Sequence, residues 1–278
     1  MIVELTGEQL TVAETQLRSY LPRAHQVYGC LVLRNRVQSE PAKFLVDTWP
    51  KFNVIIYKPQ REQKGDHFKD MLFFANDEAT LAEALRNSSV IDWTSFLCVG
   101  IDLRHAEIIK AVASEKDVPS KELAMCHMMI LEDVSKLSPI DSSGISLSSL
   151  DESHLDLVNK NWKFGSSDVA RRMIGNMIRN FPSCCVLDAE GKPVSWILTY
   201  AACSIGMLYT LPEHRGKGYA KAVVSTMAKR FHALDYPVYC FIEEKNKISY
   251  NLFKTLGFTE HPSHRETWLS FNDINECV

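Results

Sequence analysis

Six consecutive residues combine glycine and basic side chains in an order suited to binding an anion: Arg215, Gly216, Lys217, Gly218, Tyr219 and Ala220. The two glycines have no Cβ, so the backbone can approach a ligand closely, and Arg215 and Lys217 add charge that suits a pyrophosphate. Residues 207–211 predict a strand before the turn, and residues 220–234 repeat apolar side chains at helical spacing. A helix N-terminus adds unpaired N–H groups and about half a positive charge. The stretch therefore predicts a site for a ligand that carries phosphates.

The turn matches neither of two common nucleotide-binding patterns, G-x-x-x-x-G-K-[ST] and G-x-G-x-x-G, which disfavours an ATPase or a Rossmann dehydrogenase. Its R-x-x-G-x-A spacing, after an apolar strand that ends at Pro212, resembles the acyl-CoA signature of the GNAT acetyltransferase superfamily. The resemblance implies that the N–H groups of residues 215–220 hold the CoA pyrophosphate. It also implies that Thr210 and Leu211 lie on the strand that flanks the pantetheine arm. The alternative is an ordinary strand–turn–helix with two solvated cations.

Length and composition indicate a soluble globular protein. The 278 residues suit one large domain or two of moderate size, and the chain is 46% apolar and 23% charged. A net charge of −3 argues against a dedicated nucleic-acid binder, and no apolar run is long enough to span a membrane. The N-terminus resembles neither a secretory signal nor a typical transit peptide. The eight cysteines form no C-x-x-C pair and are predicted to be buried free thiols in a reducing compartment, with no metal site.

The periodicity predicts alternating helices and strands along the whole chain. In the first half, helices are expected over residues 8–21, 78–86 and 103–116, and strands over residues 26–33, 43–47, 54–57, 71–75, 96–99 and 124–131. A polar, turn-rich stretch near residues 135–144 is the best candidate for a linker. In the second half, strands are expected over residues 145–150, 184–188, 193–200, 204–211, 237–244 and 266–271, and helices over residues 151–162, 167–181 and 247–256 as well as after the glycine turn. The fold class is α/β with a mixed sheet.

The order of these elements in the second half is typical of the GNAT fold. Residues 246–258 resemble the second motif of that superfamily, with Asn246 at a strand end and L-G-F after a helix. Residues 46–53, 157–165, 181–185 and 209–215 resemble glycine N-acyltransferases and their paralogues, so the chain is identified as a member of that family. The resemblance covers essentially the whole chain. It implies a degenerate GNAT-like domain over residues 1–134, a linker over residues 135–143 and an acyl-CoA-binding catalytic domain over residues 144–278.

The same resemblance implies transfer of an acyl group from acyl-CoA to the amine of glycine or another small amino acid. CoA is then a product, and no cofactor is bound permanently. The partners expected are acyl-CoA and a small amine, with no nucleic acid, and the chain is expected to be a monomer. Its compartment is expected to be intracellular, either mitochondrial by family resemblance or cytoplasmic.

Removal of the amine proton is the first point where the chain departs from its relatives. Glycine N-acyltransferases place a Glu on the strand before T-L-P, and the aligned position here is Ser204. Serine does not accept this proton at neutral pH without help, so another group serves, a water chain serves, or activity is low. The candidate bases are Glu213, His214, Glu243, Glu244 and His154. Alternation along a strand directs one of Glu243 and Glu244 towards the cleft, so this pair is favoured over Glu213.

Protonation of the leaving thiolate is the second departure. Many GNAT enzymes have a Tyr where this chain has Phe253, but a thiol pKa of about 8.5 makes the thiolate a fair leaving group unaided. Phe253 is expected to pack near the cofactor, with Tyr250 as an alternative acid. Asn246 is expected to bond to the pantetheine amides or to cap a helix.

Recognition of the acceptor carboxylate calls for a cation. Lys163, Arg171 and Arg172 lie in the region that covers the acceptor side in GNAT folds, although solvated helix cations are the more common reading. Two alternative functions stay open. One is a GNAT enzyme that acts on a polyamine or a protein amine. The other is a catalytically weak acyl-CoA-binding paralogue, which Ser204 and Phe253 favour.

Overall fold

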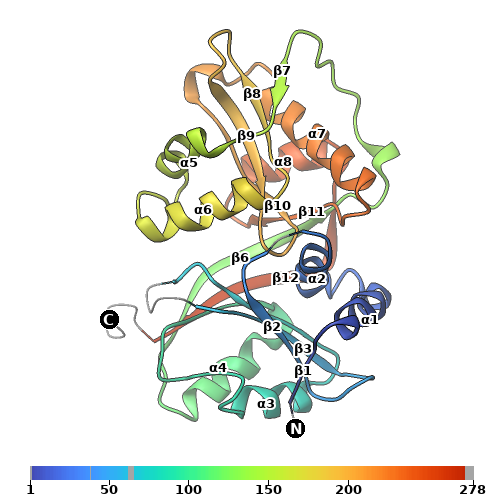
Figure 1. Cartoon of the computed structure of the whole chain (residues 1–278), viewed down its shortest axis with the longest axis vertical. Coiled ribbons are helices and arrows are strands. Elements are labelled where there is room, and N and C mark those ends of the chain that lie inside the picture. The colour runs from blue at the N-terminus through green and yellow to red at the C-terminus, as the bar shows by residue number, and fades with distance from the viewer. Residues whose placement is uncertain (1, 38, 62–65, 273–278) are drawn as a thin grey trace. The chain divides into compact units, whose positions relative to one another are not determined.

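A computed structural model describes residues 2–37, 39–61 and 66–272, which form two compact units. The first unit comprises the described residues up to His127 together with those from Pro262 onward, and the second runs from Met128 to His261. The chain passes from the first unit to the second within strand β6 (Ser120–Ile130) and returns within strand β12 (Thr259–Phe271) (Figure 1).

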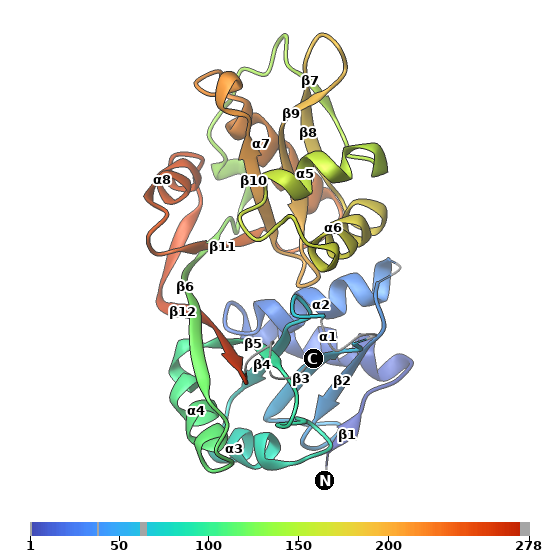
Figure 2. The same ribbon diagram turned by 90° about the vertical axis from the view of Figure 1, so that its left-hand side faces the viewer.

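The first unit contains the following elements besides β6 and β12: β1 (Val3–Glu4), α1 (Glu8–Leu17), η1 (Arg18–Tyr20), α2 (His25–Arg36), β2 (Ala42–Val46), β3 (Val54–Pro59), β4 (Met71–Ala75), α3 (Glu78–Arg86), β5 (Leu97–Asp102), η2 (Leu103–His105) and α4 (Ala106–Ser114). Its strands lie in the order β1-β2-β3-β4-β5-β12-β6. Strands β4 and β5 are parallel, whereas β12 runs antiparallel to β5. Helices α1 and α2 cover one face of the sheet and α3 and α4 the other (Figure 2), and the core lies between the sheet and these helices.

The prediction of a strand over residues 26–33 was wrong, because this run lies inside helix α2. Every residue from His25 to Leu33 is buried, so the helix has no polar face over this length. A short apolar run with no polar side shows neither the period of a helix nor that of a strand. The β-branched and aromatic residues in this run then favoured the wrong choice.

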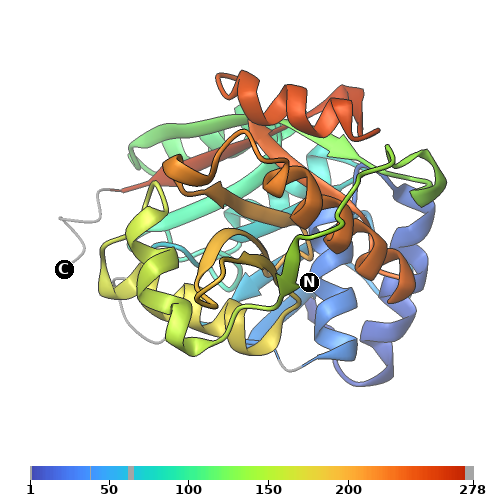
Figure 3. The same ribbon diagram turned by 90° about the horizontal axis from the view of Figure 1, so that it is seen from above.

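The second unit contains the following elements besides the ends of β6 and β12: η3 (Val134–Lys136), β7 (Ser146–Ser148), η4 (Glu152–His154), α5 (Leu155–Asn161), α6 (Asp168–Asn180), β8 (Cys184–Leu187), β9 (Pro193–Thr199), β10 (Ile205–Thr210), η5 (Pro212–His214), α7 (Tyr219–Ala233), β11 (Tyr239–Glu243) and α8 (Lys247–Thr255). Strands β7, β8, β9 and β10 form an antiparallel meander. Helices α5 and α6 lie on one side of β9 and helix α7 on the other (Figures 1 and 3).

The compact units differ from the predicted domain ranges in two places. The predicted linker packs inside the second unit, where the Ser138 N–H donates to the Leu256 carbonyl at 3.0 Å. A Cβ added to Gly257 would lie 2.3 Å from the Lys136 carbonyl oxygen, which shows how closely this segment is held. The last strand extends into the first unit, where residues 266–271 pair with β5. A strand sequence specifies extended backbone but not which sheet edge satisfies its hydrogen bonds.

Strands β10 and β11 are not joined by strand pairing in the described part of the chain, although they contact one another. Strand β10 is the edge strand of the four-stranded sheet, whereas β11 is the edge strand of the eight-stranded sheet. Strand β10 also contains a bulge between Gly206 and Tyr209, where Met207 takes φ 51°. A bulge bends its strand and re-aims the backbone. The N–H and C=O groups on this edge of β10 therefore make no ladder to β11.

Candidate functional site

The turn between β10 and α7 has the backbone of an anion-binding site. Gly216 and Gly218 have φ values of 77° and 78°, a region that residues with a side chain adopt only at a cost. A Cβ added at either position would meet no atom within 4 Å, so the backbone angle and not crowding requires glycine there. Gly218 is the N-cap of α7 and offers no side-chain hydrogen bond. The first N–H groups of α7 have no partner within the helix, and they point outward with the positive end of its dipole.

Two cations of the turn behave differently. The Nε of Arg215 donates to the Thr210 carbonyl at 3.1 Å, and its guanidinium lies 5.7 Å from the centre of the Tyr209 ring. This contact holds Arg215 against the end of β10. Lys217 is exposed. The turn thus presents one positioned and one solvent-facing cation beside the N-terminus of α7.

The strand end before the turn is fixed by its neighbour β9. The hydroxyls of Thr210 and Ser195 are 2.8 Å apart, and the Leu211 N–H donates to the Val194 carbonyl at 2.9 Å. On the other side of the turn, Tyr219 and Ala220 are the first, half-buried residues of α7. The predicted cofactor residues of this stretch are therefore contiguous in space as well as in sequence.

Asn246 and Phe253 belong to the second predicted motif. The Asn246 side chain accepts a hydrogen bond from the Ser249 N–H at 3.1 Å, so it caps α8, as one of its two expected roles requires. Phe253 is only 3% exposed and packs edge-on against Phe258 at 5.0 Å between ring centres. The nearby Tyr250 hydroxyl donates to Glu260 at 2.6 Å. A contact of Asn246 or Phe253 with the cofactor stays a prediction.

The predicted base positions are spread over the second unit. Ser204 is 5% exposed and lies in the turn between β9 and β10, at the opposite end of β10 from the glycine turn. Its carbonyl accepts from the Tyr200 N–H at 2.9 Å. Glu213 is exposed within η5, and His214 stacks on Tyr219 with 6.5 Å between ring centres. Glu244 is half-buried just beyond β11.

His154, one of the predicted candidate bases, has a structural role. Its Nδ1 accepts a hydrogen bond from the Asp151 N–H at 3.0 Å, which completes a capping box at the start of η4. His154 therefore serves as a helix-capping residue in this structure.

Glu243 forms an ion pair with Lys163 that sequence reasoning missed. The Lys163 Nζ lies 2.6 Å and 2.8 Å from the two carboxylate oxygens of Glu243. Lys163 comes from the loop between α5 and α6, and Glu243 is the last residue of β11. Eighty residues separate the two in the sequence, and no local pattern signals such a contact. Arg171, a second predicted acceptor cation, pairs instead with Asp156 at 2.8 Å.

The equivalent turn of the first unit has the opposite electrostatics. Between β4 and α3 stands Asp77, which caps the helix by accepting from the Thr80 N–H at 2.7 Å, and Glu78 follows it. The stretch contains no glycine. Two carboxylates at a helix N-terminus occupy the place where an anion would bind. This turn of the first unit therefore lacks the features that suit the glycine turn of the second unit to a phosphate.

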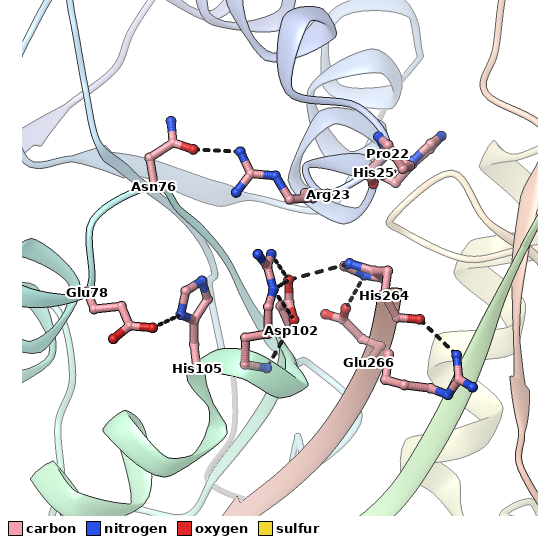
Figure 4. Close-up of polar contacts among 11 residues, drawn as sticks. Pro22, Arg23, His25, Asn76, Glu78, Asp102, His105, His264 and Glu266 are labelled. Carbon is pink, nitrogen blue, oxygen red and sulfur yellow. Dashed lines mark hydrogen bonds and ion pairs between the residues drawn. The ribbon is translucent and has the colours of Figure 1, made fainter. Parts of the chain in front are cut away.

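A buried group of charges lies between β5 and β12 of the first unit (Figure 4). His264 lies 2.9 Å from Glu266 through Nε2 and 3.4 Å from Asp102 through Nδ1, and Arg104 pairs with Asp102. Burial lowers the pKa of His264, but hydrogen bonds to Asp102 and Glu266 raise it to about 9. Burial raises the pKa of Glu266 to about 7 against the effect of His264. Burial also raises the pKa of Asp102, but bonds from His264 and Arg104 outweigh it and lower that pKa overall.

This group makes stability depend on pH. Because the pKa of His264 is raised in the folded protein, its contribution to the free energy of unfolding is fully present below pH 6.5 and is lost as pH rises through about 9. The raised pKa of Glu266 acts in the same direction, with loss as pH rises from 4.5 through about 7. Asp102, whose pKa is lowered, loses its contribution only as pH falls below 3.8. Urea unfolding midpoints should therefore decline from pH 6 to pH 9, and Glu266→Gln should reduce the decline. A midpoint that rises over this interval would contradict the assignment.

Among the described residues, no group of three or more His, Cys, Asp or Glu side chains is arranged to hold a metal ion. In the same part of the chain, no helix has the length and apolar composition needed to cross a bilayer.

The seven cysteines that the structure describes are free and buried, as predicted, and Cys277 lies outside the described residues. Burial raises the pKa of Cys184 to about 11 and that of Cys185 to about 12, so neither is a nucleophile at neutral pH.

Comparisons with known proteins agree with this geometry. The family model of aralkyl acyl-CoA:amino acid N-acyltransferases matches residues 1–182, and the model of their C-terminal region matches residues 184–271. Mouse glycine N-acyltransferase is 34% identical over 91% of this chain and 94% of its own length. Rat glycine N-acyltransferase is 31% identical over 97% of this chain and 99% of its own length.

Among solved structures, the X-ray structure of a Drosophila protein superposes with a TM-score of 0.81 at 16% identity and covers 98% of both chains. A tandem GNAT protein from the clavulanic acid biosynthesis pathway gives a TM-score of 0.54 at 13% identity over 97% of both chains. At these identities the likeness concerns the fold alone.

The mixed sheet, the bulged strand and the glycine turn at the start of α7 are features of the GNAT fold, and the predicted α/β fold with two GNAT-like domains in tandem is confirmed. The chain belongs to the aralkyl acyl-CoA:amino acid N-acyltransferase family. It is an enzyme that uses acyl-CoA as its acyl donor and an amino acid as the acceptor.

Proposed function

We propose that this chain transfers an acyl group from acyl-CoA to the amine of glycine or another small amino acid, giving an N-acyl amino acid and CoA. The observation that carries the proposal is the turn from Arg215 to Ala220. Its left-handed glycines and the open N-terminus of α7 suit the CoA pyrophosphate. The mouse and rat relatives are named glycine N-acyltransferases, which supports glycine as the acceptor.

The unpaired edge of β10 supports a place for the pantetheine arm. With no ladder to β11, this edge offers backbone N–H and C=O groups to the amides of the arm. The bulge at Met207 re-aims one such N–H, which would polarise the thioester carbonyl. The neutral amine then attacks the thioester carbon. The C–N bond forms, the C–S bond breaks, and the thiolate leaves with the electron pair.

The base that removes the amine proton is not Ser204 alone, because a buried hydroxyl does not accept a proton at neutral pH. Glu243, Glu244 and Glu213 stay the carboxylate candidates, with Glu243 favoured by its place at the end of β11. The absence of a carboxylate at position 204 also supports a second candidate function, an acyl-CoA-binding paralogue with weak turnover.

One assay separates these functions. Purified protein is incubated with phenylacetyl-CoA or other acyl-CoAs and glycine, and free thiol is followed. Thiol release that depends on glycine is the expected result. Release with spermidine or a peptide but not with glycine would replace the proposal by a polyamine or protein acetyltransferase. Tight CoA binding without turnover would support the second candidate function, an acyl-CoA-binding paralogue.

We further propose that the chain acts as a monomer inside the cell. The free cysteines suit a reducing compartment inside the cell, and the family resemblance supports the mitochondrion, with the cytoplasm as the alternative. Subcellular fractionation tests the location, and size-exclusion chromatography of the native protein tests the monomeric state.

A further inference from the structure

The ion pair between Lys163 and Glu243 joins the loop between α5 and α6 to the end of strand β11. Strand β10, helix α7 and strand β11 follow one another along the chain, and β10 contacts β11. Thr210 ends β10 and Glu243 ends β11. Because these two strands are in contact but not paired, Glu243 belongs to the strand next to the open edge of β10.

Lys163 approaches this edge from the side opposite α7. It lies in the loop between α5 and α6, and these two helices face α7 across β9 (Figures 1 and 3). The positive N-terminus of α7 receives the CoA phosphates in the proposed function. An ion pair on the other side of the sheet is therefore placed to meet the second substrate and not the first.

Both partners of the pair remain open to solvent. The Lys163 side chain is 60% exposed and that of Glu243 is 39% exposed, while both oxygens of Glu243 lie within 2.8 Å of Nζ. Phe164 lies next to them, half exposed, with its ring centre 4.8 Å from Nζ. Ion pairs between exposed side chains contribute little to stability. A ligand that offers one carboxylate and one ammonium can replace the two partners without leaving either charge unpaired.

We propose that Lys163 and Glu243 are the residues that bind the acceptor amino acid. Their ion pair opens, the acceptor carboxylate binds the Lys163 ammonium group, and the acceptor ammonium group binds the Glu243 carboxylate. This assignment rests on the proposed function and names the residues that set its acceptor class. A free α-amino acid satisfies both charges at once. A polyamine has no carboxylate and meets repulsion from Lys163, so it is rejected.

The test compares glycine with glycinamide, which keeps the amine and lacks the carboxylate, using phenylacetyl-CoA as donor. Lys163→Met should raise KM for glycine about 10- to 100-fold, the range for loss of a charge-assisted hydrogen bond, and leave KM for phenylacetyl-CoA unchanged. The preference of the wild-type protein for glycine over glycinamide should fall towards unity in the same variant. Arg179→Met, which removes an exposed cation of α6 that pairs with Glu152, is the matched control and should change neither constant.

A charge exchange separates binding from a structural role. The double variant Lys163→Glu with Glu243→Lys keeps an ion pair of reversed polarity. If the pair only held the loop to β11, the exchange would restore KM for glycine, and the proposal would be wrong. The proposal predicts that KM stays high while the thermal midpoint remains close to that of the wild type. An unchanged KM in Lys163→Met would also overturn it.

Direct binding keeps the test independent of turnover. Saturation-transfer NMR of glycine with the CoA-loaded protein should show a signal in the wild type and lose it in Lys163→Met. Glycine binding without thiol release would contradict the proposed function and still support this assignment. Glycine binding that survives Lys163→Met would contradict the assignment whether or not the enzyme turns over.

Discussion

Gly218→Glu is expected to lower the affinity for CoA about 100-fold or more. Gly218 has φ 78° at the N-cap of α7, and a side chain in this region costs about 1–3 kcal/mol. The new carboxylate would also stand among the N–H groups proposed to hold the pyrophosphate, where like charges repel. A hundredfold loss of affinity corresponds to about 2.8 kcal/mol, since about 1.4 kcal/mol is a factor of ten in affinity. Isothermal titration calorimetry with CoA measures the change.

Gly191→Glu provides the matched control for this experiment. Gly191 lies in the turn between β8 and β9 of the same unit, has φ 79°, and has no atom within 4 Å of an added Cβ. The substitution therefore brings the same backbone strain and the same charge at a place without a proposed ligand. CoA affinity should be unchanged in Gly191→Glu. Equal affinity in the wild type and Gly218→Glu would show that the turn does not bind the cofactor.

His264→Ala is expected to lower the free energy of unfolding by about 3–5 kcal/mol, the usual cost of removing one partner from a buried ion pair. The side chains of His264 and Glu266 are each 3% exposed, and that of Asp102 is 8% exposed. Without the imidazolium, the two carboxylates would face one another in the core, and Arg104 reaches only Asp102. This loss is a large part of the roughly 5–15 kcal/mol that stabilises a typical domain. Urea denaturation at pH 7 measures it.

Two further variants separate the burial of charge from the loss of packing. Replacing both partners, His264→Leu with Glu266→Leu, leaves no unpaired charge on β12 and should recover most of the stability. Arg86→Met breaks the exposed pair with Glu115 on the same unit, where the side chains are 48% and 46% exposed, and should change the midpoint little. If His264→Ala were no more destabilising than Arg86→Met, the buried charges would not be coupled as the structure indicates.

The local sequence pattern predicted the helices and strands in which apolar residues recur with a regular spacing or that a turn residue bounds. Helix α3 and strand β4 have the predicted bounds, and Ser167 caps α6 by accepting from the Ala170 N–H at 3.1 Å. The same reasoning failed at α2, whose buried run has no polar face to reveal its period. It also left the last strand with the second domain, because pairing with β5 depends on residues more than 160 positions away.

By itself, the sequence determined the glycine turn, because a turn of this kind needs only neighbouring residues: two glycines with φ above 70°, two cations and the start of a helix. Only the tertiary structure decided which charges meet. It joined Lys163 to Glu243 across 80 residues and placed His264 between Asp102 and Glu266. The physical reason is range: a turn is specified by backbone angles within a few residues, whereas an ion pair depends on how distant elements pack.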